Sequence, residues 1–436
     1  YNFRYNIFSS EWPVANRVIE LYLQKKSENG GWERQINGIS NNEKAVLLLE
    51  KRTFKELLVD MELRNLQNNI VGQEASRLFA RAEINMGVEA FRDSLYSLLK
   101  RNTFLNIKFE NMLDTLGEIS RTDIRSLLGE WEKTTPLPFY SLGEPTLTKI
   151  TNKGGEEFFV LKMLISNNSD YDGIIHMDIR KDGWWYQPLE DPRAKTKIEM
   201  PAHTSKEFVS VWEDQIRNVE INTMVSGNLP NIISQDINNV KQERNKIVKD
   251  SIYILPESSF DLPGEIIVDN EDSTLFILSA PPIVGLLPKW LDEVEETPFK
   301  YSGISWWRPP LQWTATTNDR YYGKYIRSAF VIKSGDGSQT ATWKVPVPEV
   351  GQYDLYYHVF KDDELRWNNN LQGEYHFKVK YGSEVEDAYV NLRKANEGWE
   401  QLGSYYFDSD TIRVVLTDEC KLRSVTADAV KIVKRY

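Results

Sequence analysis

The chain has 436 residues, of which 41% are hydrophobic and 27% charged, and this globular balance excludes wholesale disorder. The net charge is −11, from 53 basic and 64 acidic side chains. No run is dense in Lys and Arg, so the sequence argues against nucleic-acid binding.

A chain of this length is expected to hold roughly two to four domains. Cys420 is the only cysteine, so no disulfide can form within the chain. No stretch approaches the roughly 18–20 apolar residues that span a bilayer as a helix. The sequence starts at Tyr1, inside a segment that already has the pattern of a folded region. We therefore expect a fragment of a larger protein.

Residues 1–139 are predicted to form a helical region. Apolar residues recur there at helical spacing in two series: Phe54, Leu57, Leu58 and Met61, and Val88, Phe91, Leu95 and Leu98. Ser120 followed by Asp123 resembles a capping box before another helical segment. Pro136 and Pro138 end the region, because proline has no backbone N–H to continue a helix.

Residues 140–238 change to the period of a β-strand. Ile175, Met177 and Ile179 alternate with polar residues, which predicts a half-buried strand. Apolar runs on both sides of this strand complete a small antiparallel β-sandwich.

Residues 239–312 are predicted to be a connector, with a short helix or loop over 239–250 and a proline-rich linker over 251–312. The linker is too apolar to be free in solvent, so we expect it to pack on its neighbours. Residues 313–436 are again strand-rich, which predicts a second sandwich or jelly roll. The predicted fold class is therefore multidomain α + β, with an N-terminal helical region followed by two antiparallel β-sandwich domains.

No catalytic motif is present. The chain lacks H-E-x-x-H, G-x-S-x-G, G-x-x-x-x-G-K-[ST] and G-x-G-x-x-G. The four histidines lie in predicted β regions with no i, i+4 pair, so they predict no metal site: His176, His203, His358 and His376. Cys420 has no histidine nearby in the sequence and is expected to be a half-buried structural residue. We predict no catalytic residue, no metal and no cofactor in this chain.

Two acidic or turn-like segments also favour a structural interpretation. Ser334–Gln339, "SGDGSQ", lacks the alternating carboxylates of a calcium loop and is predicted to be a hairpin turn. Paired acidic residues such as Asp362 and Asp363 are expected to lie on a solvated face, because nothing places them across a cleft.

Tryptophan supplies the candidate binding residues. Exposed aromatic rings can stack on the C–H face of a sugar, while nearby amides bind hydroxyls. The candidate ligand-binding residues are Trp306, Trp307, Trp367, Asn368, Asn369 and Asn370. An alternative is that Trp306 and Trp307 only pin the linker to the sandwich. Trp343 and Trp399 are predicted to be core residues.

Residues 84–139 resemble the end of the catalytic domain of M1-like (gluzincin) aminopeptidases. The matching positions are Gly87, Phe91, Phe104, Phe109, Leu113, Ser120, Asp123, Trp131, Leu137 and Pro138. The resemblance extends over about residues 1–240 and implies a helical wall followed by a small β-domain. It departs from the family at residues 76–87, "SRLFARAEINMG", where the family's tyrosine is missing. Any zinc would be held upstream of this chain.

Residues 29–58 further resemble large bacterial envelope proteins in which an ABC-type permease is fused to an M1-like peptidase. This resemblance implies a periplasmic or other extracytoplasmic location, anchored to the membrane through upstream segments. The implied partners are the upstream membrane or catalytic portion of the same polypeptide, and a peptide.

Residues 313–436 resemble the golvesin, or xanthan-lyase C-terminal, β-sandwich. The matching features are Tyr322-Gly323, Trp343, Pro348, Gly351, Tyr353, Trp399, Leu402-Gly403 and Ala427-Asp428-Ala429-Val430. The resemblance implies a jelly roll appended to a secreted hydrolase, with a glycan or another surface molecule as its ligand.

These observations lead to three hypotheses for function. In the first, the chain is a non-catalytic accessory and binding region of a cell-envelope M1-like metallopeptidase, shaping its substrate cavity. In the second, it is a carbohydrate-binding module with spacer domains. In the third, it is a structural subunit of a membrane transport complex with a degenerate peptidase fold.

Overall fold

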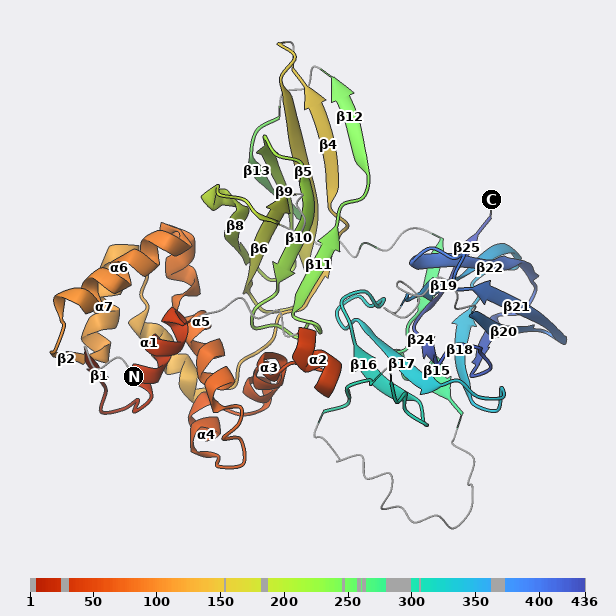
Figure 1. Cartoon of the computed structure of the whole chain (residues 1–436), viewed down its shortest axis with the longest axis horizontal. Helices are drawn as coiled ribbons and strands as arrows, with labels where there is room; N and C mark the ends of the chain where they lie inside the picture. The colour runs from red at the N-terminus through yellow and green to blue at the C-terminus, as the bar shows by residue number, and fades with distance from the viewer. Residues whose placement is uncertain are drawn as a thin grey trace. The chain divides into compact units, whose positions relative to one another are not determined.

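The computed structural model describes residues 5–24, 31–152, 154–181, 187–244, 248–256, 260, 264–279, 299–305, 307–361 and 373–435. The chain divides into two compact units (Figure 1). The first comprises Tyr1–Asn29 and Asn41–Phe260, and the second comprises Gly30–Ser40 and Asp261–Tyr436. Among the described helices, none has the length and apolar character needed to cross a membrane.

The first unit begins with helices packed around one apolar core. They are α1 (Ala15–Leu23), α3 (Asn41–Lys51), α4 (Phe54–Val59), α5 (Gln67–Met86), α6 (Val88–Arg101), α7 (Phe109–Ser120) and the 3₁₀ helix η1 (Arg125–Glu132). Strands β1 (Asn6–Phe8) and β2 (Asn106–Lys108) pair in parallel beside them. The rings of Trp12 and Trp131 meet edge to face in the core, with centroids 5.0 Å apart.

One helix start differs from its prediction. The capping box lies at Thr53 and Glu56, where it begins α4. Ser120 is instead the last residue of α7, and Asp123 accepts a hydrogen bond of 3.2 Å from the backbone of Ser126 in η1. Met61 lies beyond the end of α4 and is 74% exposed, so the helical spacing overran this helix by part of a turn.

Two facing sheets form the sandwich of the first unit. One has the order β11-β10-β6-β7 with β8 paired to β6, and the other has the order β12-β4-β5-β9-β13 with β3 paired to β5. The strands are β3 (Tyr140–Leu142), β4 (Thr146–Thr151), β5 (Glu157–Asn167), β6 (Gly173–Lys181), β7 (Gln187–Pro188), β8 (Lys195–Met200), β9 (Thr204–Trp212), β10 (Ile216–Asn222), β11 (Ile232–Asp236), β12 (Val240–Arg244) and β13 (Ser251–Pro256). Ile175, Met177 and Ile179 are all buried between the sheets, as their alternation predicts.

Buried polar contacts join the helices of the first unit to its sandwich. Glu83 on α5 forms an ion pair with Lys197 on β8, and their side chains are only 3% and 4% exposed. The hydroxyl of Tyr22 on α1 donates to the other oxygen of Glu83 at 2.9 Å. The backbone N–H of Asn231 donates to Glu43 of α3 at 2.9 Å. These contacts fix the helices against the sandwich, because breaking any of them would leave a buried polar group unsatisfied.

The described residues of the second unit form a β-sandwich and the short helix α2 (Gly31–Asn37). Its sheets have the orders β14-β25-β19-β22, β15-β18-β23-β20-β21 and β16-β17-β24. The strands are β14 (Glu265–Val268), β15 (Phe276–Leu278), β16 (Thr314–Thr317), β17 (Ser328–Lys333), β18 (Thr340–Pro346), β19 (Gly351–Val359), β20 (Glu374–Tyr381), β21 (Glu384–Asn391), β22 (Gly398–Phe407), β23 (Thr411–Thr417), β24 (Ser424–Ala427) and β25 (Val430–Lys434). Trp343, Tyr357 and Phe377 fill its core.

The expected connector over residues 239–312 contains strands instead. β12 and β13 extend the first sandwich, while β14 pairs with β25 and β15 pairs with β18 in the second. β12, "VKQER", escaped prediction because it is an exposed edge strand without alternating apolar residues. The α + β class with antiparallel sandwich domains is confirmed, and the second sandwich begins ahead of residue 313.

The segment Ser334–Gln339 is not a hairpin turn. It leads from β17 in the three-stranded sheet to β18 in the five-stranded sheet, so its flanking strands do not pair with each other. The buried carboxylate of Asp418 holds it in place by accepting hydrogen bonds of 2.7 Å from the backbone of Gly337 and 3.3 Å from that of Gln339. The segment is therefore a crossover between sheets.

The backbone at Gly303 lies against the last turn of α2. A Cβ at this position would lie 1.9 Å from the carbonyl oxygen of Ile36. We expect Gly303→Ala to lower the free energy of unfolding of the second unit by about 1–3 kcal/mol, because the backbone must move to make room. Urea unfolding measures the change. Gly351→Ala in the same unit is the control, because its Cβ would lie an ordinary 3.4 Å from the flexible end of the Lys434 side chain. Equal stabilities of the two variants would refute the close approach.

Candidate functional site

Most of the predicted ligand-binding residues fall where the structure gives no placement. Trp306, Trp367 and Asn368–Asn370 lie outside the described residues. Trp307 is described and is 68% exposed, with the guanidinium of Arg423 5.3 Å from its ring centroid. The structure therefore shows Trp307 as an exposed ring with a cationic neighbour and leaves the other predictions as they were.

The described histidine, cysteine and acidic side chains do not form a catalytic or metal-binding cluster. Within the described ranges, no three His, Cys, Asp or Glu side chains lie close enough to hold a metal ion. Cys420 is half-buried, and burial raises the pKa of its thiol above the usual value, which disfavours the nucleophilic thiolate. His376 stacks on Tyr389 with ring centroids 4.9 Å apart and contacts Asp387 at 2.7 Å. These side chains have structural partners.

A different set of aromatic residues gathers on the outer face of the β14-β25-β19-β22 sheet. On β19, Tyr353, Leu355, Tyr357 and Val359 point into the core, so Tyr356 and His358 between them point outward. The register places Trp399 of β22 opposite His358, and Lys431 of β25 opposite Tyr356. Directly opposite residues of antiparallel strands share a face, so all four side chains lie on the outer side of this sheet.

A loop residue completes the group. Tyr322, between β16 and β17, packs its ring 5.0 Å from Trp399 and 5.8 Å from His358. His358 and Trp399 meet at 5.2 Å in an edge-to-face arrangement. All of these rings are half-buried, so each keeps part of its surface in solvent. We call Tyr322, Tyr356, His358, Trp399 and Lys431 the aromatic surface.

Charged groups surround the aromatic surface. The ammonium group of Lys431 lies 4.9 Å from the ring centroid of Trp399 and 5.4 Å from that of Tyr356, within the range of a cation–π interaction. It also pairs with Glu265 of β14 at 3.0 Å. Arg320, two residues before Tyr322, pairs with Glu397 at 2.7 Å. Hydrogen-bond donors and carboxylate acceptors thus lie beside the half-buried rings of the aromatic surface.

Asp428 supports the aromatic surface from below. It is fully buried in the turn between β24 and β25, and its Oδ2 lies 2.8 Å from His358 Nδ1. The same oxygen accepts a hydrogen bond of 3.1 Å from the backbone N–H of Tyr322. One carboxylate therefore positions both a strand residue and a loop residue of the aromatic surface.

Burial raises the pKa of Asp428 above its ordinary value, and its pair with His358 opposes this shift only in part. The folded protein thus holds this proton to a higher pH than the unfolded chain does. Stability is therefore lost as the pH rises from about 4, the unfolded value, through the folded pKa. We expect Asp428→Asn, which has no proton to lose here, to depend less on pH. Urea midpoints at pH 4 to 7 measure this, and a slope unchanged from that of the parent chain would contradict it.

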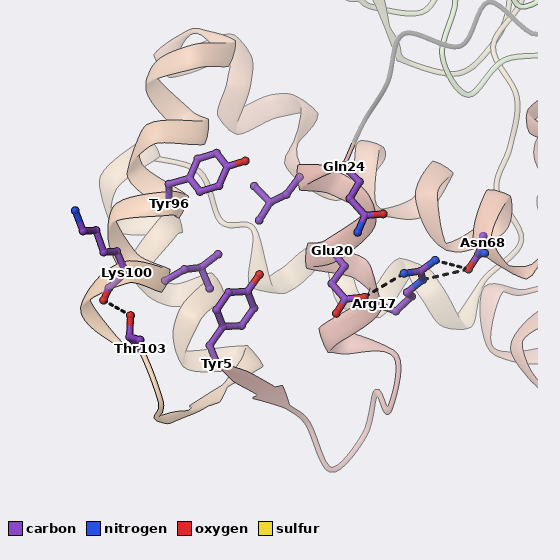
Figure 2. A pocket seen from close by; sticks show the side chains of 10 residues that line it. Tyr5, Arg17, Glu20, Gln24, Asn68, Tyr96, Lys100 and Thr103 are labelled. Carbon is purple, nitrogen blue, oxygen red and sulfur yellow. Dashed lines mark hydrogen bonds and ion pairs between the residues drawn. The ribbon is translucent and has the colours of Figure 1, made fainter. Parts of the chain in front are cut away.

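A second candidate site is a cavity of about 1130 Å³ in the helical part of the first unit (Figure 2). Glu20 of α1 and Gln24, the residue that follows this helix, line one side of it, and Tyr96 and Lys100 of α6 line the other. Arg17 is already engaged, since it pairs with Glu20 at 3.1 Å and its Nε donates to Asn68 at 3.1 Å. The lining mixes both charge signs with apolar groups, so it does not select one class of ligand.

The sequence pointed only indirectly to the aromatic surface. Tyr322, Trp399 and Asp428 belong to the motifs that carry the golvesin resemblance, yet Trp399 was predicted to be a core residue. It is half-buried on the outer face instead, whereas Trp343 is fully buried as predicted. His358 and Lys431 could have been found from the outward parity of β19 and β25, once those strands were known to pair.

Comparison with protein families finds a match for the last domain. Residues 309–434 match the model of the Golvesin C-terminal domain. The matched range contains every member of the aromatic surface and excludes the first unit. A search of curated proteins finds no match for the chain.

Solved structures give weak likenesses. A structure of TmCBM61 in complex with beta-1,4-galactotriose is 16% identical, with a TM-score of 0.16, and the match covers 28% of this chain and 77% of that one. The beta-glucuronidase of Bacteroides uniformis is 10% identical, with a TM-score of 0.19, over 69% of this chain. The chain spans only 30% of that enzyme's length. At such TM-scores these likenesses carry no argument about ligand or activity.

Proposed function

We propose that this chain is a non-catalytic accessory region whose last domain binds a carbohydrate on the aromatic surface. The observation that carries the proposal is the outward-facing group formed by Tyr322, His358 and Trp399, in which neighbouring rings lie 5.0–5.8 Å apart. The Golvesin match over residues 309–434 supports a binding role and an extracytoplasmic location.

The chemistry of the aromatic surface suits a sugar. The C–H face of a pyranose packs on an aromatic ring, where its burial and the ring's electron-rich face both favour contact. Sugar hydroxyls need donors and acceptors at the rim of such a ring. The Lys431–Glu265 and Arg320–Glu397 pairs offer both kinds of group, at two different borders of the aromatic surface.

A finer proposal concerns the first unit. The resemblance of residues 84–139 to M1-like peptidases supports a role in shaping the substrate cavity of such an enzyme, at the bacterial cell envelope. This proposal rests on the sequence pattern alone. Sequencing the gene upstream of Tyr1 tests it: H-E-x-x-H, followed by a glutamate at the family's spacing, is expected. A parent sequence without that motif would remove the peptidase assignment and leave sugar binding untouched.

A glycan array screened with the whole chain tests sugar binding. We expect retention of at least one group of related glycans, and competition by the same free oligosaccharide. Tyr389→Ala serves as the matched control, because it removes an exposed ring of the same unit that lies on β21, outside the aromatic surface. Failure to retain any glycan, across arrays of plant, microbial and animal sugars, would reject the proposal.

A further inference from the structure

Strand β13, with the sequence "SIYILP", forms an apolar edge of the first sandwich. It pairs with β9 on one side, and on its other side none of the described residues pairs with it. Its side chains are exposed on both faces of the sheet: Ile252 by 48%, Tyr253 by 51%, Ile254 by 73% and Leu255 by 40%. Four consecutive exposed apolar residues on an edge strand are a template for pairing with another strand.

The opposite edge of the same sheet shows how such pairing is normally prevented. β12 carries Lys241, Glu243 and Arg244 on an exposed strand. Charged side chains discourage a second strand from docking at an edge. β13 has no charged residue between Ser251 and Pro256, so this protection is present on one edge and missing from the other.

We propose that β13 pairs antiparallel with β13 of a second copy of this chain, joining two sheets edge to edge across a two-fold axis. An antiparallel strand is complementary to itself under such an axis, because each contact is repeated in reverse. Centring the axis on Tyr253 places Tyr253 opposite its copy and Ile252 opposite Ile254. Opposed residues then share a face of the sheet, and apolar cross-strand pairs of this kind stabilise a sheet.

Because β13 is neutral, it favours pairing with a copy of itself over pairing with a charged peptide. The charges of such a peptide would lie beside the apolar side chains of Ile254 and Leu255. One strand pair is a small contact compared with the roughly 1,200–2,000 Å² buried in stable complexes. The association is therefore weak, and the experiment must be able to trap it.

Disulfide trapping tests the pairing in the full chain. Cys420→Ser first removes the only native cysteine, and Tyr253→Cys is then added. At the two-fold axis the two Cα atoms would lie about 4.5–5.5 Å apart, within the roughly 4.4–6.8 Å that a disulfide spans. We expect a covalent dimer under mild oxidation at concentrations where the parent chain dimerises in sedimentation. Glu243→Cys on β12 is the matched control and should stay monomeric.

The cross-linking results either support or overturn the pairing of β13 with its copy. Cross-linking at position 253, abolished by adding Ile254→Lys on the same strand, supports the pairing. Cross-linking that peaks at position 252 or 254 also supports it, in a shifted register. A chain that stays monomeric at high concentration and yields no dimer from any of the three positions would overturn it. So would equal cross-linking of β12 and β13, because that marks random collision. The exposed position of Ile254 lets its variant fold, which circular dichroism verifies.

Discussion

Replacing Glu83 with Gln is expected to lower the free energy of unfolding of the first unit by about 3–5 kcal/mol. The change leaves the ammonium group of Lys197, whose side chain is 4% exposed, without its countercharge. A buried charge that has lost its partner keeps its desolvation cost and loses the attraction that offsets it. Urea unfolding followed by tryptophan fluorescence measures the change.

The position of Glu83 explains why the effect should reach the whole unit. It receives the hydroxyl of Tyr22 from α1 and the ammonium of Lys197 from β8, so three elements meet at one carboxylate. Burial and the neighbouring Glu83 both raise the pKa of Tyr22, which keeps its hydroxyl protonated and able to donate. Loss of the charge therefore loosens helices and sandwich together.

Glu199→Gln is the matched control. Glu199 pairs with Arg81 at 3.1 Å between the same helix and the same strand, but the two side chains are 43% and 56% exposed. Exposed pairs contribute about 0–1 kcal/mol, so the control should change little. A combined Glu83→Gln and Lys197→Met variant should recover most of the loss, because it removes both charges and keeps an acceptor for the hydroxyl of Tyr22. Equal losses of unfolding free energy in Glu83→Gln and Glu199→Gln would contradict the stabilising role of the buried Glu83–Lys197 pair.

Trp399→Ala is expected to weaken glycan binding by about 10- to 100-fold. The ring offers apolar area to a sugar, and burying a large side chain contributes about 1.5–3 kcal/mol. Each 1.4 kcal/mol is a factor of about ten in affinity. Isothermal titration of the full chain, with a glycan selected on the array, measures the change in Kd.

Two further variants separate binding from folding. Trp399→Phe keeps a ring and should retain most of the affinity. Tyr389→Ala should bind like the parent chain, since Tyr389 lies on β21, stacked on His376, outside the aromatic surface. Unchanged melting temperatures show that the variants fold. Full affinity in the Trp399→Ala variant would show that the sugar, if bound, lies elsewhere.

Local patterns predicted the cores well, because burial imposes a period that one strand or helix displays by itself. Ile175, Met177 and Ile179 show this for a strand, and Phe91, Leu95 and Leu98 for a helix, and all six are buried. The pattern fails at edges. β12 and β13 face solvent on both sides, so neither alternates, and both fell within the connector predicted over residues 239–312.

The aromatic surface could not be assembled from local patterns. Tyr322 and Asp428 are 106 residues apart in the sequence and meet only through the folded sandwich. Trp399 was predicted to be a core residue, but it is half-buried on the outer face of the sheet. The register of β19 and β22 shifts between Leu355 and Tyr356, and this irregularity breaks the alternation that would have shown which face of the sheet Trp399 lies on. The predicted Trp367 and its asparagines remain a prediction.

Hydroxyl-radical footprinting of the whole chain, with and without the bound glycan, tests the sugar-binding assignment most directly. Oxidation of each Tyr and Trp reports how much of that ring solvent reaches. The account predicts that glycan lowers the oxidation of Trp399, Tyr322 and Tyr356 while Trp307 is oxidised as before. Protection confined to Trp307, or to rings of the first unit, with Trp399 unchanged, would contradict it.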